Sequence, residues 1–104
     1  DMERALESDY LILQPIQHVE ILRKFLCTNG FVILDEELCR EGNKYYHVIK
    51  ASKGNSEAYL NEIYYYIGKK LIEKRHPLLL EFINLNLRLL EDILQKLPMN
   101  KGQG

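Results

Sequence analysis

The sequence lacks the features that mark several large classes of protein. Its apolar runs, such as residues 31–34 and 78–80, are far shorter than the ~18 residues of a membrane-spanning helix. No charged segment followed by an apolar one opens the chain, so a secretory signal is not predicted. We therefore expect a cytoplasmic protein with no membrane partner. Its 104 residues, 46% of them hydrophobic and 28% charged, suffice for one globular domain.

Cysteine and histidine are scarce and scattered. Cys27 and Cys39 form no CxxC motif, and His18, His47 and His76 lie at wide intervals without the spacing of metal ligands. We expect reduced thiols, as in cytoplasmic proteins, in preference to a disulfide or a metal site. No structural zinc is predicted.

Charge of one sign is not in excess either. Fourteen lysines and arginines stand against fifteen aspartates and glutamates, which leaves a net charge of -1. Bulk charge therefore neither favours nor excludes an RNA partner, and any contact with nucleic acid must come from a local basic patch.

The first part of the chain is predicted to form a strand, a helix and a second strand. Residues 10–14 are almost wholly apolar and are closed by Pro15, which predicts a strand buried on both faces, as in a parallel sheet. From Gln17 apolar residues recur at helical spacing, and Asn29-Gly30 is typical of a helix end. The apolar positions are Val19, Leu22, Phe25 and Leu26, with Glu20, Arg23 and Lys24 on the other side. Residues 31–34 complete a right-handed β-α-β unit.

A hairpin follows this unit. Residues 35–40 extend the second strand, residues 41–44 form a turn, and residues 45–51 have the aromatic and β-branched composition of an antiparallel return strand. This combination resembles the end of the sheet in S-adenosylmethionine-dependent methyltransferases, where the last strand lies between the two before it. Residues 52–56 have the composition of a linker.

The second half is predicted to be helical. One helix is expected over residues 56–75, with Ser56 as its cap, and another over residues 77–97, with Pro77 in its first turn. The latter carries a coiled-coil seam and an adjacent apolar stripe, so it must pack against the first helix, another subunit or a further domain. The seam comprises Leu79, Ile83, Asn86, Leu90, Ile93 and Leu97, and the stripe comprises Leu78, Phe82, Leu85 and Leu89. Residues 99–104 are expected to be disordered.

A set of short motifs runs through nearly the whole chain. The motifs are Leu11-Ile12-Leu13-Gln14-Pro15, Leu22-Arg23 with Phe25-Leu26, Asn29-Gly30-Phe31, Asp35-Glu36, Glu41 ahead of Lys44 and Tyr46, Val48-Ile49 with Ala51, and then Gly68, Leu71, Pro77 and Leu78. Together they resemble the bacterial tRNA (adenine(22)-N(1))-methyltransferase family, TrmK. The resemblance implies that residues 1–55 are the C-terminal β-α-β-β part of a Rossmann-like α/β methyltransferase sheet, and that residues 56–98 are a helical coiled-coil domain. Within the fragment itself the fold class is α+β.

The chain departs from the family pattern in three ways. Ile16 stands where the family usually has Asn, which argues against base contacts from this position, and His47 stands where the family often has Glu. None of the six glycines is arranged as a cofactor-binding loop. We therefore expect a C-terminal fragment of an S-adenosylmethionine-dependent tRNA adenine-N1 methyltransferase. Alone, it should bind no cofactor, contain no catalytic residue and transfer no methyl group.

The resemblance implies a candidate function for the segment that follows the first strand. Gln14, Gln17 and His18 lie beyond its carboxyl end, on the side where such sheets bind substrate. They are candidate contacts to the target base or to the tRNA backbone. The alternative is that the two glutamines merely satisfy backbone groups around Pro15 and the start of the helix.

The densest basic run offers a second candidate site. Lys69, Lys70, Lys74 and Arg75 could contact tRNA phosphates. The alternative is a solvated helix end whose cations complement the helix dipole. The tyrosines at 64–66 could stack on bases, although packing between helices is the expected role.

Two further expectations concern association. In a fragment the first strand lacks its neighbour, so we expect self-association through this open sheet edge or through the helix seam. The competing function is a non-enzymatic module, in which the helical hairpin mediates dimerisation or docking and the small sheet is its base.

Overall fold

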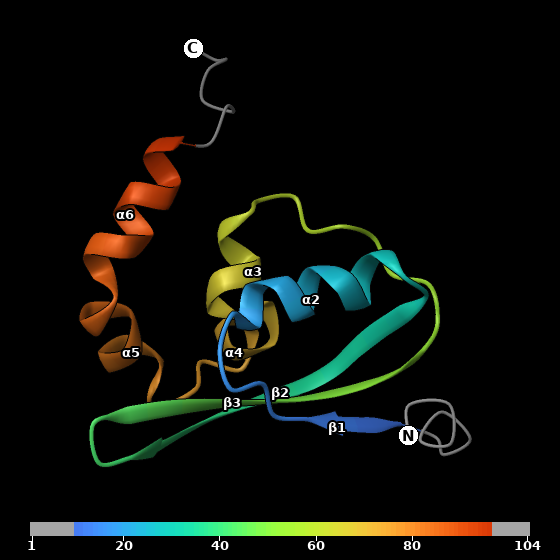
Figure 1. Ribbon diagram of the computed structural model, residues 1–104, viewed down its shortest axis with the longest axis horizontal. Helices are drawn as coiled ribbons and strands as arrows, with labels where there is room; N and C mark the ends of the chain where they lie inside the picture. Colours follow the sequence, from blue (N-terminus) through green and yellow to red (C-terminus); the bar gives the residue numbers. More distant parts are fainter. Residues whose placement is uncertain (1–9, 97–104) are drawn as a thin grey trace.

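The computed structural model describes residues 10–96, which form a small sheet with helices packed against one of its faces (Figure 1). The strands are β1 (Leu11–Leu13), β2 (Phe31–Glu41) and β3 (Lys44–Lys53). The helices are α2 (Val19–Thr28), α3 (Ile63–Ile67), α4 (Lys69–Glu73), α5 (Leu79–Leu85) and α6 (Leu87–Lys96). Helices α2, α3 and α4 lie over the sheet, whereas α5 and α6 stand beside them (Figure 1).

The sheet has the strand order that the sequence predicts. β3 lies between β1 and β2 and is antiparallel to both, so β1 and β2 run parallel to each other without touching. The register pairs Leu11 with Ala51 on one side of β3, and the hairpin closes at Glu41 and Lys44 on the other. A register shift between Ile33 and Asp35 marks a bulge in β2. The inserted last strand is thereby confirmed.

The first strand, β1, is buried on one face only. The predicted burial on both faces is wrong, because Leu11 is 5% exposed whereas its neighbour Ile12 is 58% exposed. Successive side chains of a strand point to opposite faces, and within residues 10–96 helices cover only one face (Figure 1). The strand is also shorter than expected, since Gln14 lies beyond its last paired residue.

The main core lies between α2 and the sheet. Leu26 of α2 packs there with Ile49 and Ala51 of β3, all of them fully buried or nearly so. Tyr65 of α3 joins this core with 2% of its surface exposed, and Tyr59 packs against it. The core therefore includes side chains from beyond residue 55. The division of the chain into residues 1–55 and 56–98 stays a prediction.

The predicted helix over residues 56–75 is wrong at its start and in its continuity. Residues 54–62 are not helical, and α3 begins at Ile63. Ser56 is not a helix cap, because its hydroxyl donates to the Phe31 carbonyl at 3.0 Å and approaches the Cys27 carbonyl at 3.4 Å, which ties the segment to the sheet. Gly68, with φ of +104°, then separates α3 from α4.

The second predicted helix is likewise divided. α5 ends at Leu85 and α6 begins at Leu87, and the Asn86 side chain donates to the Phe82 carbonyl at 2.9 Å. Such a local hydrogen bond competes with regular helix geometry. Leu97 and the predicted disordered tail of residues 99–104 lie outside the described residues.

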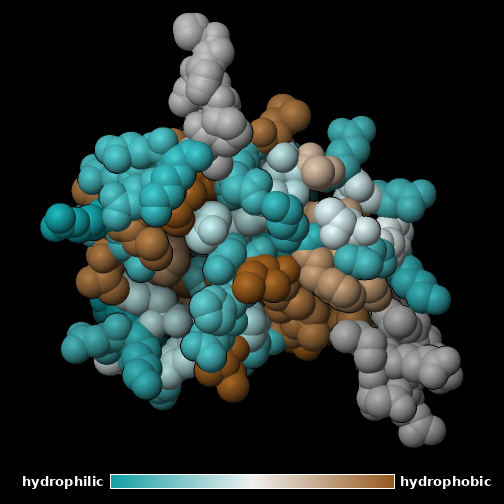
Figure 2. Space-filling model, turned by 45° about the horizontal axis from the view of Figure 1, so that its top comes forward, coloured by the Kyte–Doolittle hydropathy of each residue, from teal (hydrophilic) through white to brown (hydrophobic). Residues whose placement is uncertain are grey.

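The coiled-coil seam is used within the chain. Leu79, Ile83, Leu90 and Ile93 belong to a second apolar cluster around Ile63 and Ile67 of α3. The adjacent stripe is less covered: Leu85 and Leu89 are 65% and 54% exposed. Figure 2 shows hydrophobic side chains in separate groups among hydrophilic ones on the face that it presents.

We expect Gly68→Ala to destabilise the protein by at least ~2 kcal/mol. A Cβ there would lie 2.7 Å from Arg23 Nη2 and 2.9 Å from Glu36 Oε1, on a backbone with φ of +104°. Chemical denaturation would measure the loss. The matched control is Gly42→Ala, where φ is +62° but no atom lies within 4 Å, so only about 1 kcal/mol should be lost. Equal losses for the two variants would show that the close approach at Gly68 is unimportant.

Candidate functional site

A cavity of about 200 Å³ lies where the start of α2, the middle of β3 and helices α5 and α6 meet. It is lined by His18, Val19, Glu20, His47, Tyr66, Phe82, Asn86, Leu89 and Leu90. Because α2 starts just after the carboxyl end of β1, the cavity lies next to the edge where open α/β sheets bind ligands. We refer to it as the interhelical cavity.

The structure separates the three candidate residues that follow β1. His18 lines the interhelical cavity, has a left-handed backbone with φ of +58°, and places Nδ1 3.6 Å from Glu20 Oε2. Gln14 and Gln17 are exposed and line no part of this cavity. Within residues 10–96 neither glutamine side chain makes a hydrogen bond, so the alternative in which they satisfy backbone groups gains no support. Their role in binding stays a prediction.

A buried ion pair lies beneath this region. Arg23 of α2 and Glu36 of β2 are both fully buried, with Nε and Nη2 of the arginine 2.9 and 2.8 Å from Glu36 Oε1. Arg23 Nη1 also donates to the Tyr65 carbonyl at 2.6 Å. The predicted solvent-facing position of Arg23 is therefore wrong. Its spacing from Val19 and Leu26 on α2, four and three residues, is the signal that could have revealed it.

His47 of β3 completes the buried network. It is 8% exposed, and its Nδ1 lies 3.1 Å from Arg23 Nη2. Arginine only donates hydrogen bonds, so Nδ1 must accept and the ring proton must sit on Nε2. Burial, reinforced by the nearby Arg23 charge, lowers the pKa of His47 to about 4. The imidazole is therefore neutral at neutral pH, and it packs edge-on against Phe82 at 5.1 Å between ring centroids.

Lys74, one of the predicted tRNA contacts, is engaged in ion pairs. Its Nζ lies 2.8 Å from Glu37 Oε2 and 3.0 Å from Asp35 Oδ1, and it donates to the Glu36 carbonyl at 2.8 Å. These contacts raise the pKa of Lys74 and lower the pKa of both carboxylates. Through these contacts Lys74 holds the end of α4 against β2.

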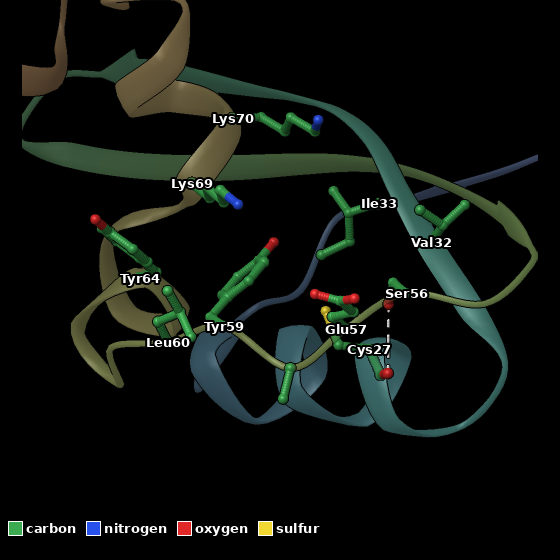
Figure 3. A pocket seen from close by; sticks show the side chains of 11 residues that line it. Cys27, Val32, Ile33, Ser56, Glu57, Tyr59, Leu60, Tyr64, Lys69 and Lys70 are labelled. Carbon is green, nitrogen blue, oxygen red and sulfur yellow. Dashed lines mark hydrogen bonds between the residues drawn. The ribbon is translucent and has the colours of Figure 1, made fainter.

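Lys69 and Lys70 instead line a second cavity, of about 380 Å³, which we call the lysine cavity (Figure 3). Lys69 Nζ lies 5.6 Å from the centre of the Tyr59 ring, and Lys70 Nζ lies 3.5 Å from Glu73 Oε1. Tyr59 and Tyr64 form part of the same wall. Arg75 is exposed and lies outside both cavities. The structure thus divides the basic run into three environments.

The tyrosines at 64–66 are divided in a similar way. Tyr65 is buried in the main core, as packing predicts, whereas Tyr64 lines the lysine cavity and Tyr66 the interhelical cavity. Cys27 and Cys39 are free thiols, the first buried and the second exposed. In the part of the chain that the structure describes, no cluster of three metal-binding side chains occurs, and every helix is too short or too polar to cross a membrane.

Comparison with known families gives a match over almost the whole chain. The family model described as tRNA (adenine(22)-N(1))-methyltransferase, TrmK, matches residues 2–103. Comparison with curated proteins gives no match.

Solved structures share the fold. The Streptococcus pneumoniae protein Sp1610 in complex with S-adenosyl-L-methionine is 24% identical, with a TM-score of 0.71, and the match covers 88% of this chain and 42% of that one. A Streptococcus agalactiae protein of the NADB-Rossmann superfamily is 26% identical, with a TM-score of 0.70 over 97% of this chain and 43% of that one. The Bacillus subtilis m1A22 tRNA methyltransferase TrmK is 22% identical, with a TM-score of 0.64 over 90% of this chain and 44% of that one. The chain therefore spans less than half the length of these relatives.

Neutralising one partner of the buried ion pair should destabilise the folded protein. We expect Glu36→Gln to lower the free energy of unfolding on the order of 3 kcal/mol, because it leaves the buried Arg23 charge uncompensated. Glu37→Gln is the matched control on the same strand. Its carboxylate pairs with Lys74 but is 54% exposed, so the loss should stay below about 1 kcal/mol. Denaturant titration of both variants would test this, and similar losses would contradict it.

The buried His47 predicts a loss of stability in mild acid. Its pKa is about 4 in the folded protein and 6.5 ordinarily, so between these values only the unfolded chain binds the proton. The free energy of unfolding should fall as pH drops from 6.5 to 4, by on the order of 3 kcal/mol, and this contribution should be constant above pH 6.5.

The control for this effect is His47→Asn. The Asn carbonyl oxygen can replace Nδ1 as the acceptor from Arg23, but it does not titrate. Denaturant titrations from neutral to mildly acidic pH should show the steeper loss in the unsubstituted protein only. The lowered pKa values of Asp35, Glu37 and Glu81 also reduce stability in acid, but they do so equally in the unsubstituted protein and in His47→Asn. Parallel pH profiles would contradict a neutral buried His47.

Proposed function

Because the chain belongs to the tRNA (adenine(22)-N(1))-methyltransferase family, we propose that it is the C-terminal part of an S-adenosylmethionine-dependent enzyme that methylates N1 of an adenine in tRNA. The observation that carries this proposal is the family match over residues 2–103, on a sheet whose last strand is inserted between two parallel ones. The cytoplasm, where an enzyme of this kind meets tRNA, is part of the proposal.

The described residues do not fit the cofactor. The four glycines among them serve other purposes, since Gly30 follows α2, Gly42 lies in the hairpin turn, Gly54 follows β3 and Gly68 is packed against Arg23 and Glu36. None belongs to a glycine-rich turn between a strand and a helix, which would let a backbone approach a nucleotide closely. Accordingly, no chemical step is assigned to this chain, and the rest of the parent enzyme is proposed to hold S-adenosylmethionine.

The segment after β1 is proposed to face the substrate. Gln14, Gln17 and His18 lie beyond the carboxyl end of the strand, and the exposed glutamines are free to offer amide groups to a base or to the sugar–phosphate backbone. Ile16, which is 98% exposed, cannot contribute such a polar contact. These residues would position the RNA and would carry no catalytic role.

The lysine cavity is proposed to contact the tRNA backbone. Lys69 is exposed and Lys70 partly exposed, and Lys69 Nζ lies 5.6 Å from the centre of the Tyr59 ring, on which an unpaired base can stack (Figure 3). Tyr64, which also lines the cavity, offers a second aromatic surface. Arg75 is a further candidate because it is exposed and carries no ion pair within residues 10–96. Lys74 supports this surface by fastening α4 to β2.

A non-enzymatic association module is the second candidate function. One observation favours it: the apolar cluster around Ile63, Ile67 and Leu90 closes within the chain, as a self-contained module requires. The exposed side of β1 is the proposed self-association edge, since among the described strands β1 pairs with β3 alone. A cooperative thermal transition together with concentration-dependent dimerisation, but no affinity for tRNA, would favour this module over the enzyme fragment.

Charge reversal at the lysine cavity tests the RNA role. We expect Lys69→Glu with Lys70→Glu to weaken binding of an unmodified tRNA transcript by more than about tenfold at low salt. The slope of log affinity against log salt concentration should become shallower by about two, because about two phosphate contacts are lost. Filter binding or fluorescence anisotropy over a range of salt concentrations would measure both quantities.

The matched control reverses the same amount of charge elsewhere. Lys44→Glu with Lys53→Glu changes two exposed lysines at the ends of β3, and neither makes an ion pair within the described residues. This double variant should lose much less affinity. If both double variants weaken binding equally, the effect is one of net charge and the lysine cavity is not the contact.

A further inference from the structure

The interhelical cavity contains a buried polar atom that nothing in the described chain satisfies. His47 lines the cavity and is 8% exposed, and its Nδ1 is occupied by Arg23 on the buried side. The remaining ring nitrogen, Nε2, therefore carries the proton. No group within residues 10–96 accepts a hydrogen bond from it. A buried donor without a partner is costly in a folded protein, so its retention points to a ligand or a trapped water.

The walls of the cavity favour a flat aromatic ligand. Phe82 and Tyr66 supply aromatic surface, and Leu89 and Leu90 supply aliphatic surface. Asn86 donates through Nδ2 to the Phe82 carbonyl, which leaves its amide oxygen as an acceptor. One fixed donor and one acceptor among apolar walls is the combination by which proteins hold an unstacked base.

The charges at the cavity exclude a phosphate as the buried group. His47 is neutral, because its pKa is far below neutral pH, and Arg23 is neutralised by Glu36 behind it. Glu20, which lines the cavity beside His18, adds a carboxylate that repels an anion. A neutral base could enter the cavity, whereas its sugar and phosphate would stay outside.

On this basis we infer that the interhelical cavity binds an unpaired base of the tRNA, and that His47 Nε2–H donates a hydrogen bond to an acceptor atom on the edge of that base. The inference rests on the proposed function, because it takes tRNA as the partner. It adds a nucleotide contact between the sheet and helices α5 and α6, separate from the lysine cavity. His47 is a binding residue here and does not act on the reacting atoms.

The test combines substitution with direct observation of the ring. His47→Asn keeps an acceptor for Arg23 but removes the Nε2–H donor, so the affinity of the 104-residue chain for an unmodified tRNA transcript should fall about three- to tenfold. His47→Gln places an amide N–H near the Nε2 position and should retain more of the affinity. His76→Asn is the matched control: His76 Nδ1 accepts from the Leu78 amide at 3.1 Å, outside the cavity, and this change should leave affinity unchanged.

Proton–nitrogen correlation spectra of the histidine rings supply a readout that does not depend on any variant. The free protein should show His47 protonated at Nε2, and the transcript should shift that signal. If tRNA binds but neither moves this signal nor distinguishes His47→Asn from His76→Asn, the cavity holds water only and the inference is overturned, while the proposed function stands. If the unsubstituted chain binds no tRNA at all, the proposed function fails and the inference fails with it.

Discussion

The buried ion pair between Arg23 and Glu36 is the interaction on which the rest of the structure depends. Both side chains are fully removed from water, which is tolerated only when each charge is compensated and each polar atom is partnered. The partners come from all around the pair. Arg23 also reaches the Tyr65 carbonyl and His47, and Glu36 accepts from the Lys70 amide at 3.4 Å. One buried network therefore joins α2, β2, β3, α3 and α4.

Both candidate sites take their positions from this network. Gly68, at the junction of α3 and α4, has no side chain, which lets the junction approach the ion pair closely and so places Lys69 and Lys70 at the lysine cavity. On the other side, Arg23 fixes the proton of His47 at Nε2 and turns a buried imidazole into a donor for the interhelical cavity. α5 is held against the hairpin of β2 and β3, because the Glu81 carboxylate accepts hydrogen bonds from Arg40 and Tyr45. The geometry of both sites thus follows from polar contacts inside the fold.

Local patterns predicted the strands and α2 well and the helices after residue 55 poorly. The hairpin and the end of α2 at Asn29-Gly30 follow from turn residues and periodicity within short segments, whereas the inserted position of β3 was implied by the resemblance to methyltransferase sheets. The predicted helix does not begin at Ser56, because the hydroxyl of that residue donates to the carbonyls of Cys27 and Phe31, which are distant in the sequence. Of the predicted site residues, His18, Lys69 and Lys70 line cavities, whereas Lys74 proved to be an ion-pair partner. A basic run looks the same in sequence whether its lysines face solvent or carboxylates.

The sequence by itself determined the succession of β1, α2, β2 and β3, the family and the likeness to the closing edge of a methyltransferase sheet, because these depend on turn residues, apolar periodicity and short motifs. Only the tertiary structure decided that Arg23 and Glu36 form a buried pair, that His47 is a neutral donor, and that the basic run divides into separate environments. The physical reason is that charge compensation and desolvation depend on which groups meet in space. Residues 23, 36 and 47 meet only after the helix has packed on the sheet, and no spacing along the chain records that contact.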